Sequence, residues 1–222
     1  MPWTLKYSDD FNRSNRNPLG APWGQLGGTN DFQLLANTAR GTVLFAYNTA
    51  VYAGGALAQS HAVEIDMLMP ALDPTYAMGG FVRYGFYAGA RRGYIFYWVP
   101  GSGTPGNILL NRYQNEIQTA IDVGGTYAVL GGTGVNFGTL RVEAVGVNPT
   151  NFFIYQNGTL LGTGQDTVAN LDQGNGGLYT NLGGSSIFDN YKAYEYSGKR
   201  HKGRHWGGEL WGIIPEVAAY LG

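Results

Sequence analysis

Residues 140–163 constrain the fold more than any other part of the chain, because they predict three consecutive antiparallel strands. From 140 to 145, the apolar residues Leu140, Val142 and Ala144 alternate with Arg141, Glu143 and Val145. This alternation has the period of a half-buried strand. After a break at Asn148-Pro149, an apolar and aromatic run leads to Asn157-Gly158. Asn-Gly between two such runs is typical of a two-residue hairpin turn, because both positions need a positive φ. The stretch therefore predicts an all-β domain.

The composition agrees with many short strands. Of the 222 residues, 44% are hydrophobic, so the chain can bury a sizeable core. Only 13% are charged, about half the usual share of roughly 25%, so the surface must consist largely of uncharged polar residues. The 36 glycines and 9 prolines fall at turn-like spacing. The chain has no cysteine, which excludes disulfides, thiol catalysis and thiolate metal sites.

Further strands are predicted along the chain, about thirteen in all. They lie at residues 3–7, at 31–37 and 41–47 as a hairpin, at 61–69, 76–87, 94–99 and 126–130, at 107–121 as a second hairpin, and at 187–196. This number is enough for two stacked sheets. No internal repeat is present.

Two groups of motifs carry a resemblance to known families. The opening pattern consists of Asp9 or Asp10, Phe11, Asn12, Arg13, Leu19, Gly20 and Trp23. It resembles the opening of a laminin G-like family that is common in bacteriophage particle proteins and some bacterial surface proteins. Residues 37–41, 140–163, 177–179 and 188–191 also resemble laminin G-like and concanavalin A-like jelly rolls. The resemblance implies a two-sheet antiparallel β-sandwich at residues 1–197, whose closing strand lies beside the N-terminal strand.

The last residues, 198–222, differ from the rest and predict a short C-terminal extension. Residues 198–206 form a basic linker, and the net charge is +2 for 198–222 against −3 for 1–197. The following apolar segment is too short for a stable isolated helix, so we expect it to dock as an anchor peptide. Its candidate assembly residues are Trp206, Leu210, Trp211, Ile213, Ile214, Val217, Tyr220 and Leu221.

Glu64 and Asp66 lie two apart on a predicted strand and invite comparison with catalytic carboxylates. The resemblance to glucanase-type jelly rolls implies a motif Glu-x-Asp-x-Glu, or the same with one more residue before the last Glu. The first Glu would be the nucleophile and the last the general acid, since retaining hydrolysis needs two carboxylates. Here the last position falls on Leu68 or Met69, neither of which can donate a proton. We therefore predict no catalytic residues and a non-enzymatic protein.

Metal and triad chemistry are also disfavoured. His61 stands without a Gly-x-Ser-x-Gly motif, and the pair His201 and His205 lies in a basic segment that opposes metal binding. Many laminin G-like domains hold calcium, and Asp9, Asp10 and Asp189 would meet if the terminal strands pair. We interpret these aspartates as turn and capping residues, and predict no metal and no cofactor.

An aromatic block at residues 81–99 is the most suggestive local feature. On its second strand Tyr94, Phe96 and Trp98 share one face, while Ile95, Tyr97 and Val99 share the other. Both faces are apolar, so one face must line the core. We consider Arg83, Tyr94, Phe96 and Trp98 as candidate carbohydrate-binding residues. The alternative, which the pattern favours, is that these side chains belong to the core or to an interface.

These observations lead to a ranked set of functional hypotheses. The first is a non-enzymatic structural protein of a bacteriophage particle, a capsid decoration, head fibre or tail component, that assembles as a homo-oligomer and contacts other virion proteins through its tail. The second is a carbohydrate-binding lectin module that recognises a host-surface polysaccharide. The third is a glycan hydrolase or lyase. The sequence shows no signal peptide, membrane span or basic stripe for nucleic acid, so we expect synthesis in the host cytoplasm and localisation in the virion.

Overall fold

The structure is a computed structural model, and it describes residues 3–25, 32–42, 47–68, 77–87, 90–99, 107–114, 117–123, 136–168, 171–181 and 186–196. Within these ranges the chain forms fifteen β-strands and no helix. The predicted all-β class is therefore confirmed. In this described part of the chain no helix is long and apolar enough to cross a membrane.

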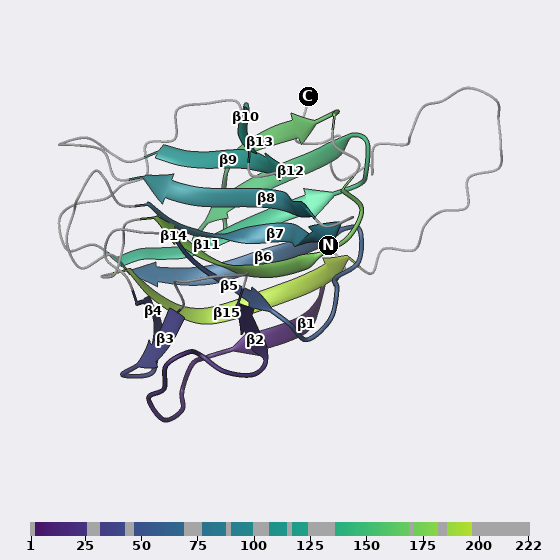
Figure 1. The fold of residues 1–222 in the computed structure, drawn as a ribbon. Coiled ribbons are helices and arrows are strands. Elements are labelled where there is room, and N and C mark those ends of the chain that lie inside the picture. Colours follow the sequence, from purple (N-terminus) through teal and green to yellow (C-terminus); the bar gives the residue numbers. More distant parts are fainter. Residues whose placement is uncertain are drawn as a thin grey trace, which may run out of the picture.

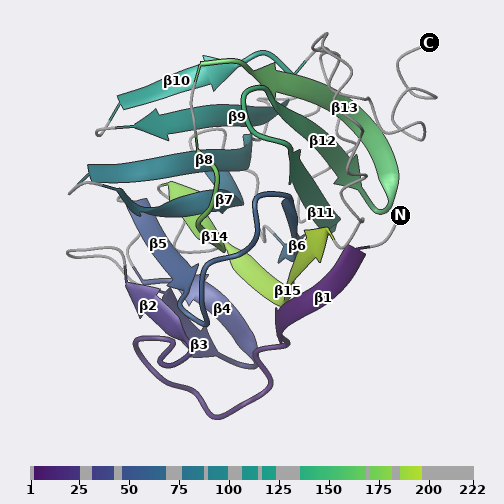
Figure 2. The same ribbon diagram turned by 90° about the vertical axis from the view of Figure 1, so that its right-hand side faces the viewer.

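Two antiparallel sheets make up the fold, and Figure 2 shows them as two facing layers. Sheet A has the order β13 (Thr159–Asp166), β12 (Thr150–Gln156), β11 (Asn136–Val145), β6 (His61–Leu68), β15 (Ile187–Tyr196), β4 (Thr38–Gly41) and β3 (Phe32–Leu35), and β1 (Trp3–Asp9) also pairs with β15. Sheet B has the order β10 (Ile117–Ile121), β9 (Asn107–Gln114), β8 (Ala90–Val99), β7 (Ala77–Tyr87), β14 (Asn175–Asn181), β5 (Tyr47–Tyr52) and β2 (Trp23–Gln25). The predicted two-sheet sandwich is confirmed (Figure 1).

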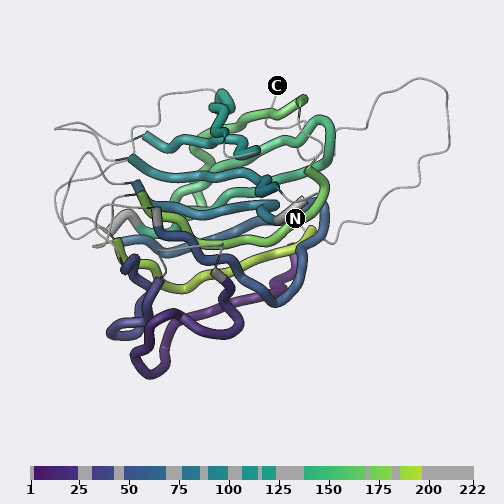
Figure 3. The backbone as a smooth tube through the Cα atoms, viewed as in Figure 1, coloured from purple at the N-terminus to yellow at the C-terminus, as the bar shows by residue number. Residues whose placement is uncertain are grey.

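The first and last described strands lie side by side, as the resemblance implied. β1 pairs with β15 in antiparallel register from Trp3↔Tyr196 to Asp9↔Tyr191. Figure 3 shows the purple start of the chain next to the yellow strand. β15 also pairs with β6, so the last described strand lies between the first one and β6, a central strand of sheet A.

The core lies between the inner faces of the sheets. On β6, Val63, Ile65 and Met67 are buried, while Glu64, Asp66 and Leu68 alternate with them and face outward. β11 and β12 repeat this alternation, with buried inner positions. The Asn157-Gly158 turn joins β12 to β13 with φ values of 48° and 79°, so the predicted hairpin is confirmed.

The opening motif forms a hydrogen-bonded turn at the end of β1, centred on the Asp9 carboxylate. The Asp9 carboxylate accepts hydrogen bonds from the Phe11 backbone N–H at 2.8 Å, from Arg13 Nη1 at 2.5 Å and from Trp23 Nε1 at 2.6 Å. Phe11 and Leu19 are buried in the core. The motif therefore specifies how the chain folds around Trp23, and its residues have a structural explanation that involves no ligand.

The first predicted hairpin differs from the observed one. The observed strands are Phe32–Leu35 and Thr38–Gly41, joined at Ala36-Asn37. The second strand therefore begins at Thr38 and not, as predicted, at residue 41. Ala36 and Asn37 both have positive φ, 51° and 59°, and such a tight two-residue turn brings the second strand forward. The predicted strand at 126–130 lies outside the described residues.

Candidate functional site

The structure places the predicted carbohydrate-binding aromatics in the core. Tyr94, Phe96 and Trp98 are 0%, 0% and 1% exposed and pack between the two sheets. Side chains with so little exposure cannot stack on a sugar, and the prediction for these residues is corrected. The inward face of β8 was mistaken for the outward one, because in a strand with two apolar faces a shift of one residue exchanges the faces.

Arg83, the fourth predicted residue, is also buried, at 0% exposure. A bulge in β7 places Arg83 and Tyr84 opposite Gly93, and Arg83 has a φ of 54°. Its guanidinium donates to the carbonyls of Leu171 (2.8 Å), Ala144 (3.2 Å) and Gly146 (2.6 Å), to the carbonyl of Gln59, and to the Thr150 hydroxyl (2.9 Å). Arg83 therefore joins three connecting segments, at Gln59, Gly146 and Leu171, to the facing ends of β11 and β12 from inside the protein, and its role is structural.

The predicted assembly residues of the tail lie outside the described residues. They are Trp206, Leu210, Trp211, Ile213, Ile214, Val217, Tyr220 and Leu221. The domain boundary near residue 197 and the anchor role stay predictions.

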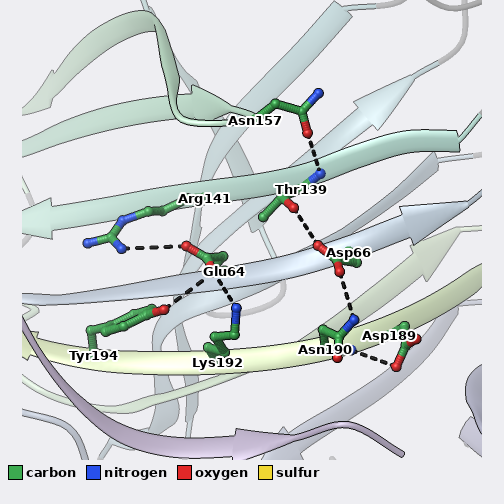
Figure 4. Close-up of polar contacts among 9 residues, drawn as sticks. All are labelled: Glu64, Asp66, Thr139, Arg141, Asn157, Asp189, Asn190, Lys192 and Tyr194. Carbon is green, nitrogen blue, oxygen red and sulfur yellow. Dashed lines mark hydrogen bonds and ion pairs between the residues drawn. The ribbon is translucent and has the colours of Figure 1, made fainter.

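The outer face of sheet A carries a connected polar network, drawn in Figure 4. We call it the Glu64 face and define it by Glu64, Asp66, Thr139, Arg141, Asn157, Asp189, Asn190, Lys192 and Tyr194. Adjacent strands place these side chains in cross-strand rows, because directly paired residues point to the same face. β6 lies in the middle, with β11 on one side and β15 on the other.

The first row centres on Glu64, which pairs with Arg141 of β11 and Lys192 of β15. Glu64 Oε1 accepts from Lys192 Nζ at 2.9 Å and from the Tyr194 hydroxyl at 3.3 Å. Glu64 Oε2 lies 3.5 Å from Arg141 Nη1. The hydrogen bond from Lys192 to Glu64 raises the pKa of Lys192. Glu64 thus lies between two cationic side chains.

The second row centres on Asp66, which pairs with Thr139 and Asp189. Its Oδ1 accepts from the Thr139 hydroxyl at 2.5 Å, and its Oδ2 accepts from Asn190 Nδ2 at 2.9 Å. Thr139 N–H in turn donates to Asn157 Oδ1 at 2.9 Å. Both oxygens of Asp66 are therefore fixed in direction by uncharged donors.

β-Bulges flank Asp66 on both sides. On β15, Asn190 and Tyr191 together face Ile65, and Asn190 has a φ of 46°. On β11, the register shifts between Asn136 and Gly138, and Gly138 has a φ of 82°. Bulges re-aim side chains and are common beside functional sites. A positive φ at a residue other than glycine persists only where its surroundings enforce it.

Aromatic rings border the polar rows. The Arg141 guanidinium lies 4.6 Å from the centre of the Tyr194 ring and 5.4 Å from that of Trp3. Trp3 also meets Tyr196 edge-on at 5.3 Å between ring centres. Cation–π contacts of this kind hold a guanidinium in place. The Glu64 face therefore combines fixed carboxylates and amides with aromatic rings, on strands that are rigidly paired.

The charges at the Asp66 end are mostly negative. Burial raises the pKa of Asp189, and the nearby Asp66, Asp10 and Asp9 raise it further. The terminal strands thus bring together the aspartates considered for calcium. Asp9, however, is occupied by Arg13 and Trp23. In the ranges that the structure describes, no three acidic or histidine side chains are arranged to hold a metal ion.

The face differs from a two-carboxylate hydrolytic site at one position. Glu64, Asp66 and Leu68 share the outward side of β6, so one of the two expected positions of a general acid carries an alkyl group, and the other, Met69, lies outside the described residues. A retaining hydrolase needs a proton donor there. The arrangement is suited to hydrogen bonding of hydroxyl groups, since it offers both acceptors and donors in fixed directions.

Comparison with known proteins bears on the fold. The sequence matches no family model and no curated protein. A β-porphyranase from the gut bacterium Bacteroides plebeius has a TM-score of 0.51 at 11% identity and covers 87% of this chain and 91% of its own. A β-glucanase from Bacillus licheniformis has a TM-score of 0.53 at 11% identity, over 85% and 97%. A Bacillus subtilis protein with a galectin-like fold has a TM-score of 0.54 at 10% identity, over 87% and 98%.

The chain has a concanavalin A-like jelly-roll fold. This confirms the fold that the late-strand motifs implied. At such low identities the similarity shows the fold alone, and one fold supports many functions. The predicted kinship with bacteriophage particle proteins finds no support in these similarities.

Several residues of the Glu64 face were missed by the sequence interpretation. Thr139, Arg141 and Lys192 read as ordinary outward residues of half-buried strands. Asn190 carried a recognisable signal, because Asp189-Asn190 interrupts an apolar strand with residue types that tolerate positive φ. Such a pair within a strand indicates a bulge, and bulges are common beside functional sites.

Proposed function

We propose that this protein is a non-enzymatic carbohydrate-binding protein and that the Glu64 face is its binding surface. The main observation behind this proposal is the Asp66 carboxylate, which lies between two bulges and accepts hydrogen bonds from Thr139 and Asn190. Sugar hydroxyls donate and accept hydrogen bonds together, so they are recognised by acceptors and donors placed in fixed positions. Asp66 and Asn190 offer such a pair on adjacent strands.

The aromatic border supports the same ligand. A pyranose ring has an apolar C–H face, which packs well on an aromatic side chain that also carries a polar tip. Trp3 and Tyr194 lie beside the polar rows and are partly exposed. Two proteins of similar fold are named for their action on porphyran and β-glucan, which also supports a glycan ligand.

Binding without hydrolysis follows from the residues on β6. Leu68 or Met69 stands where the acid would be required, and Glu64 is ion-paired with Lys192 and Arg141. We therefore expect no release of reducing sugar from any polysaccharide that the protein binds. Depolymerisation that is abolished by Glu64→Gln would contradict this part of the proposal.

A glycan array is the experiment that tests the function. The full chain is screened first, and the best glycan is then titrated by calorimetry into the wild type, Asp66→Asn and Asp172→Asn. Asp172 is an exposed residue outside the Glu64 face, so its variant controls for the loss of one charge. We expect binding to fall about tenfold or more, equivalent to roughly 1.4 kcal/mol, in Asp66→Asn only. Equal affinity in all three proteins would reject the Glu64 face.

A second candidate, a structural role on a bacteriophage particle with the protein located in the virion, rests on the basic and apolar composition of residues 198–222. We expect the full chain to form a closed oligomer through this tail and a chain ending at Ser197 to be a monomer. Light scattering of the two proteins measures this difference. Monomers in both cases would count against an assembly role between copies of the chain.

A further inference from the structure

The outer face of sheet B carries a second, chemically different surface. We call it the Tyr97 face. It comprises Phe81, Tyr84, Ile95, Tyr97, Asn111, Tyr113, Gln118 and Tyr179 from strands β7, β8, β9, β10 and β14. Ile95 and Tyr97 alternate along β8 with the buried Tyr94, Phe96 and Trp98, so they point away from the core. The Glu64 face belongs to the other sheet.

Aromatic rings on this face form a continuous array. Phe81 contacts Tyr84 and Tyr179 at ring-centre distances of 4.3 and 5.6 Å. Tyr97 lies 5.6 Å from Tyr179, and Tyr113 lies 5.9 Å from Tyr84. Phe81, Tyr84 and Tyr179 are buried, whereas Tyr97 and Tyr113 are only partly buried. The array therefore supports Tyr97 and Tyr113 from beneath and from the side, which fixes the orientation of their rings.

A row of amides lies beside these two tyrosines. Asn111 Nδ2 donates to the Tyr97 hydroxyl at 2.9 Å and to Gln118 Oε1 at 2.9 Å, so both of its hydrogens are used. Among the described residues, Asn111 Oδ1 accepts no hydrogen bond and Gln118 Nε2 donates none. An oriented donor on the exposed Gln118 and an oriented acceptor on Asn111, which is 9% exposed, thus lie next to an aromatic ring.

None of the eight residues that define the Tyr97 face carries a charge, in contrast to the Glu64 face, and the cation on the same side of β8 is Arg91, four residues before Ile95. A charged ligand placed over these aromatic and amide groups would lose water without gaining a counter-charge. An uncharged ligand with hydroxyl groups and an apolar ring face suits both the tyrosines and the amides. At Tyr97 and Asn111, the end of the face farther from Arg91, the chemistry therefore favours a neutral sugar over an anionic one.

We propose that the Tyr97 face is a second carbohydrate-binding surface, which takes a neutral pyranose chain by stacking on Tyr97 and Tyr113 and by hydrogen bonds to Asn111 and Gln118. The proposal goes beyond the Glu64 face, because it concerns the opposite sheet and a separate set of residues. Binding at both faces would let one molecule hold two glycan chains, which raises avidity without any new contact.

The test is a titration of the isotope-labelled full chain with glucose hexasaccharides, one β-1,3-linked and one β-1,4-linked, followed by NMR. We expect shifts of the Tyr97, Asn111 and Tyr113 amides, an affinity loss of about tenfold at this face in Tyr97→Ala, and near wild-type affinity in Tyr97→Phe, which keeps the ring. Tyr97 is partly exposed, so its replacement should leave the fold intact, and unchanged shifts elsewhere verify this. Asp66→Asn should leave binding at this face unchanged.

Each outcome discriminates. Shifts confined to the Glu64 face would overturn the second surface while leaving the proposed function in place. The absence of shifts with both hexasaccharides at either face would overturn the second surface, and the glycan array then decides on the Glu64 face separately. Concentration-dependent shifts of the Tyr97 face without any sugar, lost in Tyr97→Ala, would identify a contact between copies of the chain and also overturn the proposal.

Discussion

The side-chain amide of Asn190 donates to Asp66 Oδ2 over 2.9 Å, from a backbone with a φ of 46°. The strain of the left-handed conformation and the position of the amide have one cause, the bulge of β15 opposite Ile65. Without the bulge, Asn190 would follow the regular alternation of the strand and point to the opposite face from Asp189. Asp66 would then lose the hydrogen bond from the Asn190 amide. The site and the local irregularity of the sheet are therefore linked.

Substitutions at Asn190 separate backbone strain from side-chain chemistry. Asn190→Gly keeps the conformation, because glycine populates positive φ freely, so we expect thermal stability within about 0.5 kcal/mol of the wild type. Asn190→Ala removes the same amide but must hold alanine at positive φ, at a cost of about 1 kcal/mol or more. Thermal unfolding of the two variants measures the difference. Equal stabilities would show that the bulge relaxes when Asn190 is replaced.

Arg83 should be among the most sensitive positions in the protein. Lysine cannot reproduce its planar fork, so Arg83→Lys leaves several buried carbonyls without donors. We expect a loss of about 3–5 kcal/mol, as when a buried charge network is broken. Urea unfolding measures it, with the exposed Arg16→Lys as control. A loss below about 1 kcal/mol in Arg83→Lys would contradict the assigned structural role.

His61 should make stability depend on pH. Its Nε2 accepts from the Arg83 backbone N–H at 3.0 Å, so Nδ1 carries the proton and donates to the Ala58 carbonyl at 2.9 Å. Burial, together with the Arg83 charge, lowers the pKa of His61 from 6.5 to about 3. Between these values the unfolded chain binds one proton more than the folded protein, so the free energy of unfolding falls as pH falls below 6.5, by about 1.4 kcal/mol per pH unit.

The effect can be isolated in two ways. His61→Gln should remove that part of the slope between pH 6 and 4, which urea unfolding at several pH values measures. In the folded wild type, imidazole NMR signals of His61 should remain those of the neutral ring at pH 4. A titration midpoint near 6.5 would show that the ring is not buried as described.

Tyr191 and Tyr94 provide a matched pair of tyrosine-to-phenylalanine tests. The Tyr191 hydroxyl is buried without a hydrogen-bond partner among the described residues, so Tyr191→Phe should stabilise the protein by about 1 kcal/mol. The Tyr94 hydroxyl donates to Asp166 Oδ2 at 3.2 Å, so Tyr94→Phe should destabilise it by about 1–2 kcal/mol. Opposite signs are expected in the same denaturation assay. Destabilisation by Tyr191→Phe would show that its hydroxyl has a partner in solution.

Much of the fold follows from local patterns in the sequence. The inward residues of β6 alternate strictly, and Asn157-Gly158 has turn chemistry that few other dipeptides match. Each of these patterns spans only a few residues, so it can be recognised in the sequence without knowledge of the tertiary structure. The pairing of β1 with β15 came from the family resemblance, because no local pattern relates strands that are so far apart.

The sites were harder to predict, because they depend on which face of a strand turns outward. β8 is apolar on both sides, so its pattern could not distinguish Tyr97 from Trp98 as the outward residue. The network around Asp66 joins β6, β11 and β15, and its geometry arises from bulges that depend on pairing. Asp9 looked like a metal-ligand candidate, yet it is occupied by Trp23, a contact between residues 14 positions apart.

The central claim, that Asp66 and its partners bind a glycan, is tested most directly by calorimetry. The glycan selected on the array is titrated into the wild type and into Asn190→Gly, whose fold is verified by thermal unfolding. We predict that the dissociation constant rises about tenfold in Asn190→Gly while the melting temperature stays unchanged. A dissociation constant equal to that of the wild type would show that the Asn190 amide neither contacts the ligand nor holds Asp66 for it, which contradicts the claim.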